Sequence, residues 1–143
     1  MKAKIKWLFF IAIVIAGIYM GVRLCLPTEI IDVHLDNELI VKNFPILKTN
    51  REKWWNENES SLNNKYNFPT TDTNGSYFVR IIDIGHGYEE EIPDRDWFLP
   101  GGSTDHLFCF NEMTVKNRCV RKDHILMEIS KDSKGKVTFY FFK

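Results

Sequence analysis

The chain has 143 residues, of which 44% are apolar and 27% are charged, and its formal net charge is zero. This length allows one ordinary domain, or a small domain with an appendage, and excludes a multidomain enzyme. The neutral balance gives no electrostatic reason to expect nucleic acid as a partner.

The first 27 residues predict a membrane anchor. Residues 7–26 form an apolar run that is interrupted only by Arg23, and the run is long enough to cross a hydrocarbon core of about 30 Å as a helix. Arg23 lies near the end of the run, where its side chain reaches the headgroups. Three lysines precede the run, and the positive-inside bias keeps them cytoplasmic. We therefore expect residues 1–27 to form a cytoplasmic tip and a transmembrane signal-anchor helix, with residues 28–143 across the membrane.

Two alternatives to an uncleaved anchor stay open. A cleaved signal peptide shares the charged start and the apolar run, but the small-x-small cleavage site is missing before Pro27. A lipoprotein would be attached through Cys25, but the charge of Arg23 does not suit the small, apolar residues that precede a lipidated cysteine. The uncleaved anchor is the favoured interpretation.

A hairpin is predicted directly after the anchor. Residues 29–35 alternate in part, with Ile31, Val33 and Leu35 on one face, as in a half-buried strand. A turn follows, and residues 38–42 form the returning strand.

A helix is predicted over residues 50–65. Thr49 and Glu52 form a capping-box pair at its start, and the segment contains neither Gly nor Pro. One stripe of this helix is able to pack on a sheet, and it consists of Trp55, Leu62 and Tyr66.

Residues 76–83 give the clearest strand prediction, because β-branched and aromatic residues dominate the segment. Gly85 and Gly87 end this strand. Residues 88–103 are expected to be a long irregular excursion without regular elements, since two prolines and two adjacent glycines fall within it.

Two short strands, residues 106–110 and 118–120, are predicted around the remaining cysteines. Cys109 and Cys119 are an even pair within one segment, which in an oxidising compartment predicts a disulfide. Zinc binding is the alternative, and it lacks a neighbouring His or Cys pair at ligand spacing.

The chain ends in a predicted hairpin of residues 125–129 and 136–142. The fold class that we expect is therefore α+β. It consists of a single N-terminal transmembrane helix followed by a small domain with a mostly antiparallel sheet and one covering helix.

The four histidines occur singly and match no metal-binding or catalytic motif. His86 is the best candidate for a functional side chain, because Gly85 and Gly87 let the backbone turn sharply and expose what lies between them. An exposed histidine in an ordinary turn is the alternative. We expect no metal, cofactor or catalytic residue.

The segment after His86 combines acidic and aromatic residues. The acidic side chains could meet a basic partner or form solvated surface. Most aromatic side chains of the chain are expected to build the core, and Trp97 and Phe98 are the pair expected to escape it. The candidate partner-binding residues are His86, Tyr88, Glu89, Glu90, Glu91, Trp97 and Phe98.

Several motifs in order make the chain similar to a known family. They are VKNFP at residues 41–45, the Trp54–Trp55 pair, DIGHGY at 83–88 and CFNEM at 109–113 followed by Cys119. Read together, they resemble a family of uncharacterised enterobacterial membrane proteins, a domain of unknown function. The resemblance implies a single-pass protein of the bacterial inner membrane with its C-terminal domain in the periplasm, and it carries over no catalytic residue or cofactor.

The anchor, the predicted disulfide and the surplus aromatics favour a non-enzymatic, membrane-anchored periplasmic module that binds a protein partner. An immunity or accessory protein for a secreted toxin is one specialisation of that hypothesis. The alternatives are an envelope assembly or stress factor within a larger membrane complex, and a small periplasmic enzyme that uses His86 with Asp83 or Glu89. The expected partners are the lipid bilayer, through the N-terminal helix, and one protein.

Overall fold

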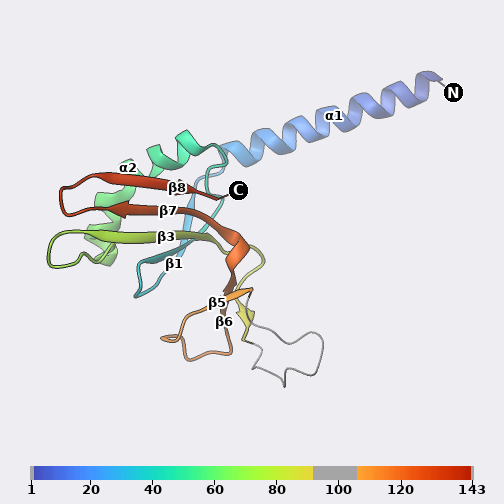
Figure 1. Cartoon of the computed structure of the whole chain (residues 1–143). Coiled ribbons are helices and arrows are strands. Elements are labelled where there is room, and N and C mark those ends of the chain that lie inside the picture. Colours follow the sequence, from blue (N-terminus) through green and yellow to red (C-terminus); the bar gives the residue numbers. More distant parts are fainter. Residues whose placement is uncertain (1, 92–105, 143) are drawn as a thin grey trace.

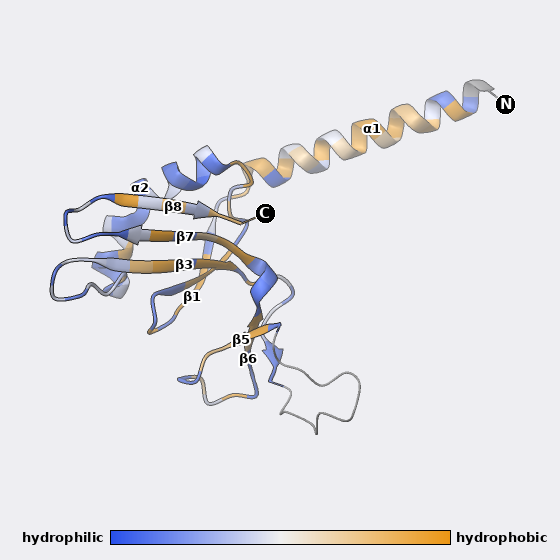
Figure 2. Ribbon diagram, viewed as in Figure 1, coloured by the Kyte–Doolittle hydropathy of each residue, from blue (hydrophilic) through white to orange (hydrophobic). Residues whose placement is uncertain are grey.

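The computed structural model describes residues 2–91 and 106–142. Helix α1, Lys2–Cys25, projects from a folded domain that holds the other elements (Figure 1). Its stretch Lys4–Cys25 is apolar and long enough to cross a membrane, and it is not buried against the domain. Figure 2 shows apolar residues around this helix. An apolar surface of this kind is stable only in a non-aqueous environment, in agreement with the predicted span.

A five-stranded sheet forms the centre of the domain, with the order β1-β2-β3-β7-β8. Its strands are β1 Glu29–Val33, β2 Glu38–Lys42, β3 Tyr77–Asp83, β7 Ile125–Lys131 and β8 Val137–Phe141. Strands β2 and β3 run parallel, and the other neighbouring pairs are antiparallel. A parallel pair needs a crossover between its strands, and helix α2, Lys48–Tyr66, supplies it. The α+β class and both predicted hairpins are thus confirmed.

A second, three-stranded sheet has the order β4-β6-β5 and lies beside the first (Figure 1). Its strands are β4 Glu89–Glu90, β5 Leu107–Cys109 and β6 Asn117–Arg121, and the short 3-10 helix η1, Lys122–His124, joins β6 to β7. The expectation that residues 88–103 contain no regular element is wrong at β4. Antiparallel pairing with β6 creates this strand, and such a long-range partner is not visible in the local sequence.

Helix α2 begins two residues earlier than predicted and without the capping box. Its N-cap is Leu47, which makes no side-chain capping bond. The guanidinium of Arg51 fixes the first turn instead, because it donates to the carbonyl oxygens of Pro45, Leu126 and Phe142. The C-cap is Asn67, whose left-handed backbone lets its N–H donate to the carbonyl oxygen of Asn63.

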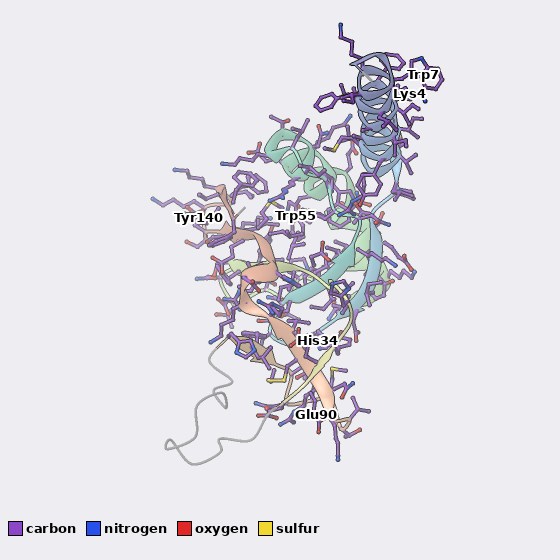
Figure 3. All side chains as sticks on the ribbon, turned by 90° about the vertical axis from the view of Figure 1, so that its right-hand side faces the viewer. Lys4, Trp7, His34, Trp55, Glu90 and Tyr140 are labelled. Carbon is purple, nitrogen blue, oxygen red and sulfur yellow. A yellow bond between two sulfur atoms is a disulfide. The ribbon has the colours of Figure 1, made fainter. Side chains whose placement is uncertain are left out.

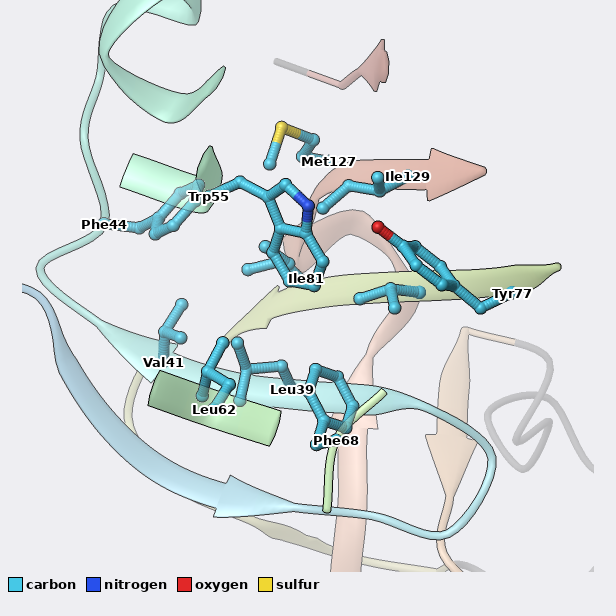
Figure 4. Packing of buried hydrophobic residues seen from close by; sticks show 11 residues of the cluster. Leu39, Val41, Phe44, Trp55, Leu62, Phe68, Tyr77, Ile81, Met127 and Ile129 are labelled. Carbon is cyan, nitrogen blue, oxygen red and sulfur yellow. The ribbon is translucent and has the colours of Figure 1, made fainter. Parts of the chain in front are cut away.

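Helix α2 covers one face of the five-stranded sheet (Figure 4). Trp55 and Leu62 are buried there, as predicted, and they pack with Leu39 of β2. The prediction for Tyr66 is wrong. This residue is the last of the helix and is 38% exposed, with the Lys65 ammonium over its ring.

The face predicted for the first strand is right for Val33 and wrong for Ile31 and Leu35. Ile31 and Leu35 are exposed, while Ile30 and Val33 pack against the core. The pairing of β1 with β2 shifts between Ile30 and Asp32. A bulge of this kind inserts one residue and reverses the alternation of the residues that follow it.

Candidate functional site

His86 has the backbone setting that its flanking glycines predicted. Gly85 and Gly87 both have positive φ, and His86 is exposed between them. A side chain at position 85 would also collide with a neighbour, because an added Cβ would lie 2.5 Å from Cε1 of His124. The imidazole of His124 therefore packs directly on the backbone of this turn.

Four of the other predicted partner-binding residues, Tyr88, Glu89, Glu90 and Glu91, are among the described residues. Tyr88 points inward, and Arg118 donates to the carboxylate of Glu91 from two of its nitrogens. Glu89 and Glu90 are exposed on β4. Trp97 and Phe98 lie outside the described residues.

The predicted disulfide between Cys109 and Cys119 is present. The two residues face each other directly in the register of β5 and β6. Cys25 is exposed and free at the end of α1.

The structure reveals a polar cluster around His34, which the sequence does not suggest. His34 follows β1 and is only 6% exposed. Its Nδ1 lies 2.7 Å from Oε1 of Glu112, and its Nε2 lies 3.0 Å from the hydroxyl of Tyr88. That hydroxyl donates to Oδ2 of Asp32 over 3.2 Å. The ring also stacks on Phe110, with centroids 3.5 Å apart.

Hydrogen bonds connect the members of this cluster in a chain. His34 lies between the carboxylate of Glu112 and the hydroxyl of Tyr88, and this hydroxyl donates to Asp32. The imidazole is thus linked to two carboxylates, to one directly and to the other through the hydroxyl.

Two neighbours of His34 have shifted pKa values in the folded protein. Burial raises the pKa of Tyr88, and the nearby Asp32 carboxylate adds to the effect, so the hydroxyl keeps its proton. Burial opposes ionisation of Glu112, but hydrogen bonds from the backbone and from His34 outweigh it and lower the pKa of this carboxyl.

This cluster ties the two sheets together. His34 and Asp32 belong to the hairpin at one edge of the large sheet, whereas Tyr88 and Glu112 flank strands of the small sheet. Figure 3 shows His34 in the half of the molecule away from Lys4 and Trp7 of α1, with Glu90 nearer the far end. Both ring nitrogens already have protein partners, and one ring face is covered. The residues were missed because 78 positions separate His34 from Glu112 and no local motif links them.

A row of side chains crosses the sheet face that α2 does not cover. Glu38, Arg80, Glu128 and Tyr140 are paired in register from β2 to β8. Arg80 bonds to Glu38 over 3.2 Å and to Glu128 over 3.1 Å. Burial raises the pKa of Glu38 to about 7, although the positive charge of Arg80 acts in the opposite direction.

Two exposed aromatic rings lie on this side of the sheet, Tyr140 at the end of the row and Phe78 beside Arg80. We call the surface formed by Phe78, Arg80, Glu128 and Tyr140 the open face. Phe78 is 43% exposed and Tyr140 is 53% exposed. The guanidinium of Arg80 lies 5.5 Å from the centroid of the Phe78 ring and 5.2 Å from that of Phe108 in the small sheet. Arg80 is therefore held between two carboxylates and two rings.

Within residues 2–91 and 106–142, no group of three His, Cys, Asp or Glu side chains is placed to hold a metal ion.

The comparisons with known proteins identify the family. The model of the enterobacterial putative membrane protein family DUF943 matches residues 1–143. No curated protein and no solved structure matches the chain. The match covers the anchor and the domain together, so the chain belongs to this family of enterobacterial membrane proteins.

Proposed function

We propose that this protein is a non-enzymatic module anchored in the inner membrane, and that its periplasmic domain binds another protein through the open face. The observation that carries the proposal is an exposed Tyr140 and Phe78 around a fixed Arg80. Tyrosine and arginine are enriched at the energetic centres of protein interfaces. Arg80 is already oriented, so binding would cost little side-chain entropy there.

Strand β8 extends the open face to the edge of the sheet. It stands last in the strand order, so β7 is its neighbour in the sheet and its other side can accept a strand. An extended segment of the partner that pairs with β8 would place its side chains next to Tyr140. We infer that the partner is a protein that presents such a segment.

The predicted topology supports a periplasmic domain. The lysines before α1 favour a cytoplasmic N-terminus, and a disulfide between Cys109 and Cys119 suits an oxidising compartment. The closed cluster at His34 supports a non-enzymatic role, since its ring nitrogens are bonded to protein groups and leave no site for a substrate proton.

Site-specific photocrosslinking in living cells tests the proposal. A photoreactive amino acid is placed at position 140 of the tagged full-length protein, and the matched control carries it at Asn56, an exposed position on α2. We expect one protein to be crosslinked from position 140 and not from position 56. Equal yields from both positions, or recovery of the protein alone, would contradict the proposal.

A substitution then measures the contribution of the aromatic ring. Tyr140→Ala is expected to weaken capture of the crosslinked partner about 30-fold, as is typical of an interface tyrosine worth roughly 2 kcal/mol. Tyr66→Ala is the control, because Tyr66 is an exposed aromatic on α2. A captured toxin domain would assign an immunity role, and co-purification with a large membrane assembly would assign an envelope factor.

A further inference from the structure

A second site lies where the membrane helix meets the domain. A cavity of about 390 Å³ is open at this junction, and its volume is in the range of small-molecule sites. The end of α1, the end of β2, the turn after β3 and η1 all contribute to its wall. Its charged and titratable lining residues are Arg23, Lys42, Asp83, His86, Asp123 and His124.

The position of Arg23 sets the depth of this cavity relative to the bilayer. Arg23 occupies the last turn of the apolar helix, which ends at Cys25. Its Nη1 donates to Oδ1 of Asn43, 3.5 Å away, so the side chain reaches from the helix to the domain. A helix that crosses the hydrocarbon core up to this turn brings the cavity to the level of the lipid headgroups.

The lining carries charges of both signs. Arg23 and Lys42 are the cations of the wall, and the carboxylates belong to Asp83 and Asp123. Asp123 is already neutralised by Arg121, which donates to both of its oxygens over 3.0 Å. Asp83 accepts the N–H of Gly85 over 2.7 Å through Oδ1, which leaves its Oδ2 for another donor.

We propose that this cavity binds the headgroup of a zwitterionic aminophospholipid. The phosphodiester lies against Arg23 and Lys42, because arginine and lysine form charge-assisted bonds to phosphate oxygens. The primary ammonium donates to Asp83. A phosphoglycerol headgroup offers Asp83 only neutral hydroxyl donors, and a choline headgroup has no N–H to offer it. The site binds lipid and shares no lining residue with the open face, so it is a function additional to protein binding.

The floor of the cavity is preorganised by the contact of His124 with the turn at Gly85. Gly85 has φ +58°, and any Cβ there would displace the imidazole. Gly85→Ala therefore distorts the cavity and leaves the charges of its lining unchanged. It can be compared with substitutions that remove the charge of Arg23 or Lys42.

The test uses the full-length protein in nanodiscs that contain equal amounts of phosphatidylethanolamine, phosphatidylglycerol and phosphatidylcholine. Native mass spectrometry after release from the disc counts the lipids that stay bound. We expect one phosphatidylethanolamine per chain, with retention reduced about tenfold by Lys42→Gln and by Arg23→Gln. Lys134→Gln, which removes an exposed lysine from the loop between β7 and β8, is the matched control and should retain the lipid.

Gly85→Ala should also lose the lipid while the variant keeps the near-ultraviolet circular dichroism of the folded domain. Three outcomes would overturn the proposal. They are retention that Lys42→Gln leaves unchanged, equal retention of phosphatidylglycerol, and equally tight binding of free phosphoethanolamine, which would make a soluble compound the ligand. Loss of the protein partner in the Tyr140 experiments would leave these results unaffected, so the two proposals fail separately.

Discussion

The two sheets of this domain are stabilised in different ways. The five-stranded sheet buries a continuous apolar cluster under α2, in which Trp55, Val79 and Ile129 are completely buried. The three-stranded sheet has strands of two, three and five residues, and its support is a disulfide, the His34 cluster and a smaller apolar group. Strands this short cannot bury enough surface alone, so covalent and polar ties replace part of the core.

The small sheet also depends on the large one. Ile40 of β2 and Ile82 of β3 are completely buried in the smaller apolar group, together with Val120 and Phe110 from the small-sheet region. Strand β2 is consequently covered on both faces, and Leu39, Ile40 and Val41 are all buried. We expect damage to the large sheet to affect both regions, whereas damage to the small sheet stays local.

The largest effect is expected from Trp55→Ala. Removal of a completely buried indole from the large core should lower the free energy of unfolding by about 3–5 kcal/mol. Urea unfolding of the full-length protein in detergent, followed by pulse proteolysis, measures the change. Trp55→Phe is the matched control. It keeps most of the volume and removes a buried indole N–H that has no hydrogen-bond partner among the described residues, so it should cost much less. Equal losses in both variants would contradict the volume of the buried side chain as the cause.

Loss of the disulfide should have the next largest effect. The double variant Cys109→Ser, Cys119→Ser frees a loop with a sequence separation of 10, and the chain-entropy relation gives a loss of about 2–3 kcal/mol. Hydrogen exchange should show faster opening of the amides in β5 and β6, with little change in β3 and β7. An equal acceleration in β3 would mean that the two sheets open as one cooperative unit.

The smallest effect is a pH dependence that originates in Glu38 of the large sheet. Its pKa is about 7 in the folded protein and 4.5 ordinarily, so the folded state binds the proton more tightly. The unfolding free energy should therefore fall by about 1–2 kcal/mol as the pH rises from 4.5 to 7, and level off above pH 7. Thermal unfolding at pH 5 and pH 8 measures this fall, which should be absent in Glu38→Gln. If the variant shows the same fall, another group is responsible.

Glu112, in the small-sheet region, should give stability the opposite dependence on pH. Its pKa is lowered in the folded protein, so its contribution to stability is present above pH 4.5 and is lost as the pH falls through the folded-state pKa. Glu38 in the large sheet thus loses its stabilising effect as the pH rises, and Glu112 in the small-sheet region loses its effect as the pH falls.

Local sequence patterns predicted the elements well where each element forms from its own residues. The apolar run correctly predicted α1, and the segment rich in β-branched residues predicted β3. The cysteine pair predicted the disulfide that joins β5 to β6. Trp55 and Leu62 were correctly placed in the core because helical spacing fixes which residues share a face.

The features that the sequence did not reveal depend on residues far apart in the chain. A bulge in β1 moved Ile31 to the surface, Leu35 falls in the turn after the strand, and pairing with β6 created β4. The cluster at His34 combines three segments, and its histidine looked unremarkable beside His86, whose glycines gave a local signal. The parallel pairing of β2 with β3 likewise follows from packing under α2 rather than from either strand.

Strand order also determines how force would pass through the molecule. Helix α1, the candidate membrane span, is connected to β1 at one edge of the sheet through residues 26–28, while β8 lies at the opposite edge. If a bound partner at β8 is pulled away from the membrane, the force passes through the hydrogen bonds between every pair of neighbouring strands. The load enters the sheet at the bulged strand β1, and β3 lies at the centre of its path.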